Sequence, residues 1–139
     1  MCTRQTWGRS TGNGVYDKLY VVKGGTTDRL LTNFTGVKKA NDGLYPTTNA
    51  EGLTPGGLIC PSYYYMALLS EKAGVYHAIA FFVPHSELLP DNPGKNEFMV
   101  YAVSIESLEY ETGIDFFCNL PNEIEKKVEA VYNAEDWVW

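Results

Sequence analysis

The pattern of apolar and polar residues divides the chain into short extended segments followed by helices. The continuous apolar run Leu19–Val22 predicts a strand, and an unbroken run of this kind favours a buried central one. The segments 58–72 and 75–85 are rich in β-branched and aromatic residues, and the link 71–74 between them has hairpin length. Gly74 supplies the positive φ that such a turn needs. With FMVYAVS at 98–104, we expect an antiparallel sheet of strands near 19–23, 60–70, 75–83 and 98–103.

Two helix signals follow the last predicted strand. Ser104 or Ser107 offers an N-cap, and Gly113 is placed to end that helix in the left-handed conformation. Asn122 is a second N-cap candidate, with Glu125 three residues later as in a capping box. We therefore expect helices near 105–112 and 123–133 on one face of the sheet, and Ile124, Val128 and Val131 to share the inward face of the second.

The link between these helices is unusually apolar for a loop. It carries Ile114, Phe116 and Phe117, so we expect it to plug the space between the helices and the sheet, with both Phe side chains largely buried. The pattern as a whole predicts an α+β fold, an antiparallel sheet with helices packed on it.

The remaining segments lack a clear period. Residues 26–34 are compatible with a further strand but alternate poorly, and residues 84–97 form a polar loop with three prolines. Residues 35–57 are rich in Gly, Pro, Asn and Thr, which predicts a long loop of a kind that is often functional or variable.

Length and composition narrow the class of protein. A chain of 139 residues is long enough for one domain with its own core, so we expect residues 1–139 to form a single domain. The 45% apolar content excludes a disordered chain, and no apolar run is long enough to span a bilayer. The first residues lack the apolar centre of a signal peptide, which leaves the compartment open. Cys2, Cys60 and Cys118 are odd in number and lack metal-like spacing, so we expect one disulfide at most.

The net charge of −6 is unevenly distributed. Residues 1–60 hold seven basic and four acidic side chains, whereas residues 61–139 hold four basic and thirteen acidic ones. An acidic half repels a phosphate backbone, so an anionic partner would be met by the basic half. The candidate nucleic-acid-binding residues are Lys23, Arg29, Lys38 and Lys39, although ordinary solvated surface charge explains them as well.

Three groups of residues are candidates for a chemical role, but each also has a structural explanation. His77 lies within a predicted strand, where a hydrogen-bonded sheet histidine is expected; a catalytic role would require a partner acid and a metal. His85 follows a strand end and is expected in a turn. The tyrosines 63–65 could stack on nucleic-acid bases, but packing against the core explains alternate members of a strand.

Three collinear blocks carry a resemblance to a known family. YAVSIESLEYETGIDFFCNLPNEIEKKVEA at 101–130 resembles the closing segment of the DNA/RNA non-specific endonucleases, the ββα-metal family, with its Thr-Gly-Ile-Asp-Phe-Phe block. LYVVKGGT at 19–26 resembles the family strand that ends in a glycine turn. CPSYYYMALLSEKAGVYHAIAFFVPH at 60–85 resembles the family hairpin, although Ser62 stands where a Lys is usual.

The resemblance implies a metal-dependent endonuclease, but its catalytic motifs are missing from this sequence. The family uses an Asp-Arg-Gly-His motif, whose His is the general base, and an Asn segment that holds a hydrated cation, usually Mg²⁺. Here Asp28-Arg29 is followed by Leu30-Leu31, and both motifs precede the first matching strand in the family. We therefore name no catalytic residue and no metal ligand. We expect the chain to be the C-terminal portion of such a domain, inactive alone and binding no cation alone.

Two alternatives to an endonuclease stay open. One is a non-catalytic, nuclease-like module that binds a partner or carbohydrate through the 35–57 loop, and the other is an inhibitor-like or structural domain. For the intact family domain the resemblance implies nucleic acid as partner and Mg²⁺ as cofactor, and we expect no membrane partner. The resemblance is compatible with secretion or a place in the cell envelope, but the sequence leaves the compartment open. The sequence does not choose between DNA and RNA.

Overall fold

The computed structural model describes residues 15–139, whose contacts divide into two compact units. We call the first the sheet unit: the described residues up to Lys23, together with Met66–Phe82 and Asn92–Trp139. We call the second the loop unit: Gly24–Tyr65 and Val83–Asp91.

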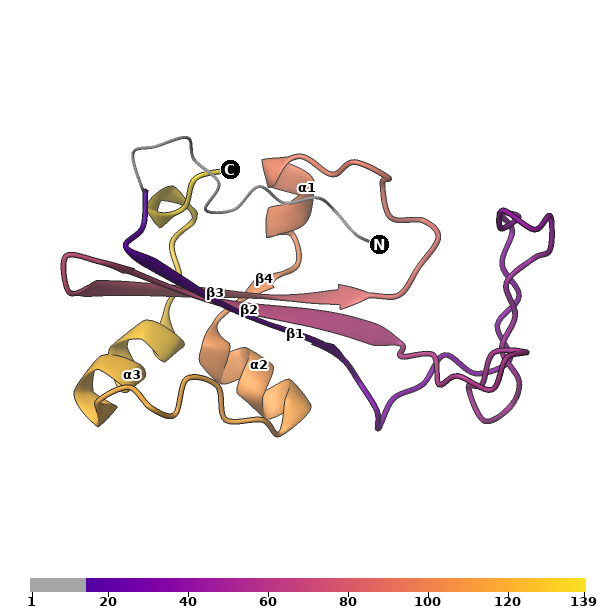
Figure 1. The fold of residues 1–139 in the computed structure, drawn as a ribbon, viewed down its shortest axis with the longest axis horizontal. Coiled ribbons are helices and arrows are strands. Elements are labelled where there is room, and N and C mark those ends of the chain that lie inside the picture. The colour runs from indigo at the N-terminus through magenta and orange to yellow at the C-terminus, as the bar shows by residue number, and fades with distance from the viewer. Residues whose placement is uncertain (1–14) are drawn as a thin grey trace. The chain divides into compact units, whose positions relative to one another are not determined.

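The central element is a four-stranded antiparallel sheet, which confirms the predicted α+β class (Figure 1). Its strands, in spatial order, are β1 (Lys18–Gly25), β2 (Tyr63–Lys72), β3 (Val75–Pro84) and β4 (Ala102–Val103). In the sheet unit, β3 pairs with β4 so that Ala80 lies opposite Val103 and Phe81 opposite Ala102.

The hairpin between β2 and β3 turns at Ala73 and Gly74, within the predicted link. Both residues have positive φ, 50° and 76°, as a tight two-residue hairpin turn requires. The Ala73 N–H also donates to Asp17 Oδ2 at 2.8 Å, which ties the turn to the start of β1. Gly74 therefore has the role that the sequence predicted.

The prediction that β1 is a buried central strand is wrong. β1 is the first strand in the sheet order, with β2 as its neighbour, and Tyr20, Val21 and Val22 are 39–44% exposed. A continuous apolar run does not distinguish a strand covered on both faces from one that lies at the end of a sheet. The sequence pattern thus identified the strand but not its place.

The prediction of a strand over 98–103 is also wrong in its first half. Residues Lys95–Met99 form a short helix, α1, and only Ala102–Val103 are extended. The Phe98 N–H donates to Gly94 O at 3.0 Å, and the Phe98 ring lies 4.5 Å from that of Phe81 between centroids. A helical turn is what brings Phe98 onto the sheet, and this contact outweighs the β propensity of the segment.

The helices α2 (Ile105–Thr112) and α3 (Asn122–Ala130) lie on the same face of the sheet, as predicted, whereas α1 and the C-terminal segment lie on the other (Figure 1). The cap signals of α2 are confirmed. Ser104 Oγ accepts a hydrogen bond from the Ser107 N–H at 3.1 Å, and Gly113 ends the helix with φ 68°.

Helix α3 differs from its prediction at both ends. Its N-cap is Pro121 rather than Asn122: Pro121 O accepts from the N–H groups of Ile124 and Glu125, and this cap has no side-chain hydrogen bond. The helix ends at Ala130, not at 133, and Val131 is extended and 68% exposed. A 3₁₀ turn, η1 (Ala134–Asp136), follows. Proline fixes the φ of the entry residue and so decides where the helix begins.

The apolar link between α2 and α3 is a plug of one side chain, not three. Phe116 is 2% exposed, as predicted, but Phe117 is only partly buried and Ile114 is 41% exposed. Phe117 has a positive φ of 60°. The buried apolar residues of the described chain all belong to the sheet unit: Ala67, Leu68, Leu69, Ala78, Ile79, Ala80, Phe81, Phe98, Ile105, Leu108, Phe116, Val128 and Trp137.

The loop unit contains isolated bridges in place of a further strand. Leu30 pairs with Pro61, Thr35 with Thr47 and Leu53 with Ile59, and between these bridges the chain turns repeatedly. The weak strand considered for 26–34 is therefore a single bridge, and the long loop predicted for 35–57 is confirmed. Within residues 15–139, no helix has the length and apolarity that crossing a membrane requires.

Candidate functional site

Three carboxylates from separate segments of the sheet unit converge. Glu109 lies in the second half of α2, Asp115 in the link after Gly113, and Glu129 near the end of α3. One carboxylate oxygen of each lies within 4.8 Å of the others. The left-handed turn at Gly113 reverses the chain after α2, and α3 then packs beside α2, so the fold itself creates the cluster.

The cluster is electrostatically strained. Burial raises the pKa of the Glu129 carboxyl to about 7, with a further contribution from the charge of Glu109. Glu129 Oε1 is buried and has no hydrogen-bond partner. Burial also raises the pKa of Glu109, although the Phe116 N–H, which donates to its Oε1 at 2.7 Å, acts in the opposite direction. A buried carboxylate oxygen without a donor is costly unless it is protonated or neutralised.

The donor set fits a hard divalent cation, because Mg²⁺ and Ca²⁺ prefer carboxylate oxygens. No metal ligand is predictable from the sequence at these three positions. Their spacing carries no ligand motif: Glu109 and Asp115 are separated by a helix end, and Glu129 belongs to another helix. The one local signal is that a carboxylate falls on each side of Gly113.

His77 has the partner acid that the sequence did not identify. Its Nδ1 lies 2.9 Å from Asp136 Oδ2, and the two side chains are 40% and 30% exposed. The acid belongs to η1, where Asn133 Oδ1 accepts a hydrogen bond from the Glu135 N–H, and it is followed in the chain by the buried Trp137. A carboxylate on Nδ1 fixes the imidazole tautomer and leaves Nε2 as the basic nitrogen. The prediction of a hydrogen-bonded sheet histidine is thus confirmed.

The second histidine forms part of a small cluster in the loop unit. His85 Nδ1 lies 3.0 Å from Pro61 O and 3.5 Å from Cys60 Sγ, and its ring lies 5.1 Å from that of Tyr64. Burial raises the pKa of the Cys60 thiol, which disfavours a nucleophilic thiolate. Cys60 and Cys118 are free thiols, and Cys2 lies outside the described residues.

Each of the four candidate nucleic-acid-binding residues has different surroundings. Lys23 is exposed on β1, in the sheet unit. Arg29 lies in the loop unit, where its guanidinium carbon is 5.5 Å from the centre of the Tyr63 ring and its Nε is 3.8 Å from Asp28 Oδ2. A stacked arginine is held in a fixed orientation, which is compatible with recognition of a planar or anionic group.

Lys38 and Lys39 share a turn of the loop unit. Lys38 Nζ lies 3.6 Å from Asp91 Oδ1, and Lys39 Nζ lies 5.5 Å from the centre of the Tyr45 ring. Neighbouring acids therefore partly neutralise this turn. The structure also places Tyr64 at 44% exposure, with Tyr63 and Tyr65 more buried, so alternate tyrosines face different environments as expected for a strand.

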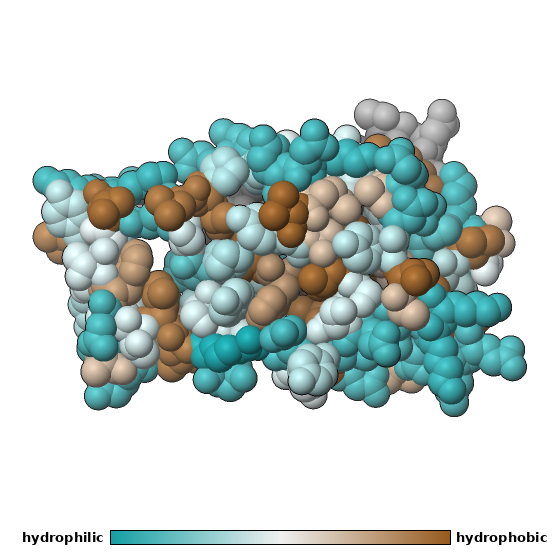
Figure 2. Space-filling model, turned by 180° about the vertical axis from the view of Figure 1, so that it is seen from behind, coloured by the Kyte–Doolittle hydropathy of each residue, from teal (hydrophilic) through white to brown (hydrophobic). Residues whose placement is uncertain are grey.

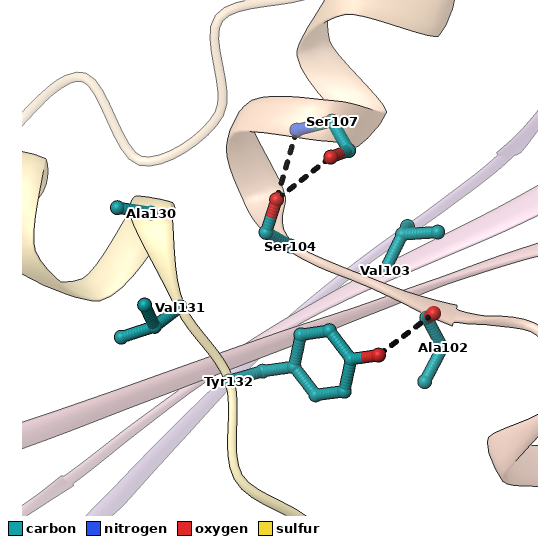
Figure 3. Close-up of a pocket in the computed structure, with 7 residues that line it drawn as sticks. All are labelled: Ala102, Val103, Ser104, Ser107, Ala130, Val131 and Tyr132. Atoms are coloured by element: carbon teal, nitrogen blue, oxygen red, sulfur yellow. Dashed lines mark hydrogen bonds between the residues drawn. The ribbon is translucent and has the colours of Figure 1, made fainter.

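A shallow hollow lies between the start of α2 and the end of α3 (Figure 3). It measures about 440 Å³ and is lined by Ala102, Val103, Ser104, Ser107, Ala130, Val131 and Tyr132. The Tyr132 hydroxyl donates to Ala102 O at 3.1 Å, and the Ser104 hydroxyl donates to Ser107 Oγ at 2.9 Å. None of the lining residues is charged, so the hollow lacks the cations that a phosphodiester would need.

Apolar side chains also reach the surface of the described chain. Figure 2 shows them interspersed with polar ones on the face that it presents. The most exposed in the loop unit are Leu88, Val37, Leu58 and Leu44, at 91%, 76%, 72% and 67%. Scattered exposed apolar residues are normal in folded proteins and do not by themselves define a binding surface.

Comparison with known families agrees with the collinear sequence blocks. The chain matches the family model of the DNA/RNA non-specific endonucleases over residues 7–123 of its 139 residues. A comparison with curated proteins finds no match. The matched region includes the hairpin, α2 and the link with Asp115 and Phe116, whereas Glu129 and Asp136 lie beyond it. The chain belongs to the DNA/RNA non-specific endonuclease family.

Proposed function

We propose that this chain supplies the sheet and helices of a metal-dependent endonuclease that hydrolyses phosphodiester bonds in DNA or RNA. The observation that supports it best is the family match over residues 7–123. The family implies a nucleic-acid substrate, and the Thr-Gly-Ile-Asp-Phe-Phe block that marks the resemblance contributes Asp115 to the acidic cluster.

We propose further that residues 1–139 alone do not supply the catalytic base. The family base belongs to an Asp-Arg-Gly-His motif, which the printed sequence does not contain. His77 is the one histidine within residues 15–139 with a carboxylate partner, but Asp136 lies beyond the matched region. Charge without a positioned base lowers the barrier to phosphodiester hydrolysis very little.

In place of the expectation that residues 1–139 bind no cation alone, we propose that Glu109, Asp115 and Glu129, which lie apart from the family's Asn segment, have the donor chemistry to hold a divalent cation. A divalent cation supplies positive charge to phosphate oxygens in such hydrolysis. We propose Mg²⁺ as the ion, because carboxylates are its usual protein ligands. At this cluster the three side chains would lose their mutual repulsion, and α2, the link and α3 would be held together.

A non-catalytic, nuclease-like binding module is the second candidate. Two observations favour it: the catalytic motifs are missing from the printed sequence, and the loop unit exposes Val37, Leu44 and Tyr45 close together along the chain. Such a module would bind nucleic acid or a protein without cleaving it. Its contacts would lie in the 35–57 segment, and its binding would not depend on Mg²⁺.

The test is a plasmid-nicking assay on the purified chain with Mg²⁺ or Mn²⁺, and with His77→Ala as a control. We expect no metal-dependent nicking by residues 1–139, and nicking by a longer product that carries an Asp-Arg-Gly-His motif ahead of them. Robust nicking that His77→Ala abolishes would instead make His77 the base and overturn the proposal. Nicking that is the same in the control would indicate contamination.

A further inference from the structure

The turn at residues 36–38 of the loop unit holds an anion with its backbone. The Val37 N–H donates to Glu87 Oε2 at 2.6 Å, and the next N–H, of Lys38, donates to Glu87 Oε1 at 3.2 Å. Two successive backbone N–H groups that converge on the two oxygens of one carboxylate form an anion-binding concavity. Because a phosphate group also presents paired oxygens, the same geometry suits it.

Gly36 makes room for this anion. It is buried, and a Cβ at this position would lie 2.7 Å from Glu87 Oε1 and 2.5 Å from Pro46 Cγ. The turn is held in shape by contacts that do not involve Glu87: the Gly36 N–H donates to Pro46 O at 2.8 Å, and Thr35 pairs with Thr47. The concavity is therefore formed by the loop itself and would persist without its present occupant.

The positive charge at this turn is covered by acids from one segment. Lys38 Nζ lies 3.6 Å from Asp91 Oδ1, so both Glu87 and Asp91 of the segment 86–91 contact Lys38, one at its backbone and one at its side chain. Lys38 and Asp91 are 60% and 86% exposed, and exposed ion pairs contribute little to stability. A polyanion that makes several contacts at once can therefore replace them at small cost.

We propose that the segment 86–91 is an internal competitor, in which Glu87 occupies a phosphate-binding site formed by the backbone of residues 36–38. The identification of a nucleic-acid phosphate as the natural occupant rests on the proposed function. The site itself rests on the contacts above. Displacement of Glu87 leaves the Val37 and Lys38 N–H groups, together with the Lys38 and Lys39 side chains, to face the phosphate.

The experiment compares the wild-type chain with Glu87→Ala, using Glu51→Ala as a control that removes the same charge from an exposed position of the loop unit. Each protein is titrated at low salt with a short oligothymidylate and, separately, with sodium phosphate. The readouts are fluorescence anisotropy of the labelled oligonucleotide and the amide NMR signals of Val37 and Lys38. We expect Glu87→Ala to bind the oligonucleotide about three- to tenfold more tightly than the wild type, with both amides shifting.

The control and a blocking variant decide the outcome. Equal gains in Glu87→Ala and Glu51→Ala would show a general charge effect and overturn the proposal, as would shifts that leave Val37 and Lys38 unchanged. Adding Gly36→Ala to Glu87→Ala should remove the gain, because the methyl group fills the space of the anion. Shifts of both amides with phosphate but not with the oligonucleotide would uphold the site and count against nucleic acid, and so against the proposed function.

Discussion

The two units of this protein are stabilised in different ways. The sheet unit contains every buried apolar side chain of the described residues, including Leu68, Ile79 and Phe81. The loop unit buries only Thr26 and the glycines at 36 and 52 to the same degree. Its chain is held instead by bonds such as Asn49 N–H to Leu53 O at 3.0 Å and Cys60 N–H to Gly52 O at 2.8 Å.

Side-chain burial therefore stabilises the sheet unit, whereas backbone conformation and backbone hydrogen bonds stabilise the loop unit. Burial of apolar area stabilises the sheet unit, so removing atoms from its core is costly. A unit that relies on turns and backbone hydrogen bonds tolerates the loss of exposed side chains but not changes that forbid its φ angles. Loops with few buried contacts open at low free energy, which suits the displacement proposed for Glu87.

The largest effect is expected from Phe81→Ala in the sheet unit. Phe81 is completely buried and contacts the rings of Phe98 and Trp139, so its truncation should reduce the free energy of unfolding by about 4 kcal/mol. The matched variant in the loop unit is Leu58→Ala, at a residue 72% exposed, which should change it by less than about 0.5 kcal/mol. Urea unfolding followed by circular dichroism measures both. Similar losses in the two variants would abolish the contrast between the units.

The second expected effect concerns the plug between α2 and α3. Phe116→Ala should cost about 3 kcal/mol, because the side chain is 2% exposed, whereas Phe117→Ala should cost about half as much at its partly buried position. The comparison is sharp because the residues are adjacent and chemically identical. Thermal unfolding of both variants at one pH measures the two losses of stability. A larger loss for Phe117→Ala would show that Phe117, not Phe116, fills the space between the helices and the sheet.

The plug also shows how far the sequence could predict the fold. Periodicity and caps identified the sheet, the hairpin at Gly74 and the helix from Ser104 to Gly113, because these signals are local. The sequence could not tell Phe116 from Phe117, since a link without regular structure has no period that assigns one side to the core. The helical turn at Phe98 was missed for a related reason: a tertiary contact with Phe81 decided it.

The candidate site was less predictable than the fold. Glu109, Asp115 and Glu129 are brought together by two helices and a link, and His77 and Asp136 lie 59 positions apart in the chain. Neither the three carboxylates nor the His77–Asp136 pair has a sequence spacing that is typical of a ligand or catalytic motif. The basic residues were recognisable as such, but the acids that accompany Lys38 come from a segment some fifty residues later.

The third prediction tests whether backbone conformation stabilises the loop unit. Gly52 has φ +73°, and a Cβ there would lie 2.5 Å from Leu30 Cβ, so Gly52→Ala should cost about 2 kcal/mol. Gly43 has a similar φ of +79° but open space around it, so Gly43→Ala should cost only about 1 kcal/mol. Hydrogen exchange of the Asn49 and Leu53 amides reports the stability of the loop unit directly. Equal protection in the two variants would show that the close approach to Leu30 has no energetic consequence.

The smallest effect concerns the acidic cluster of the sheet unit, where burial of a carboxylate opposes stability. The pKa of Glu129 is raised from its ordinary value of 4.5 to about 7, so the folded state binds a proton more tightly than the unfolded state between these values. The free energy of unfolding therefore falls as the pH rises through this window. Above it, the cost of the charged Glu129 carboxylate is fully present and no longer changes with pH.

Glu129→Gln should accordingly stabilise the protein at pH 8 by about 1 kcal/mol, a figure reduced for solvent screening of a partly exposed carboxylate, and have little effect at pH 4.5. Glu123→Gln, on the exposed side of the same helix, should show no such dependence on pH. Millimolar Mg²⁺ at pH 8 should raise the Tm of the wild type and of Glu123→Gln but not that of Glu129→Gln, because the cation offsets the repulsion that the substitution has already removed. If Glu129→Gln is no more stable than the wild type at pH 8, the carboxylate is not strained. If Mg²⁺ raises the Tm of all three proteins equally, the ion binds elsewhere.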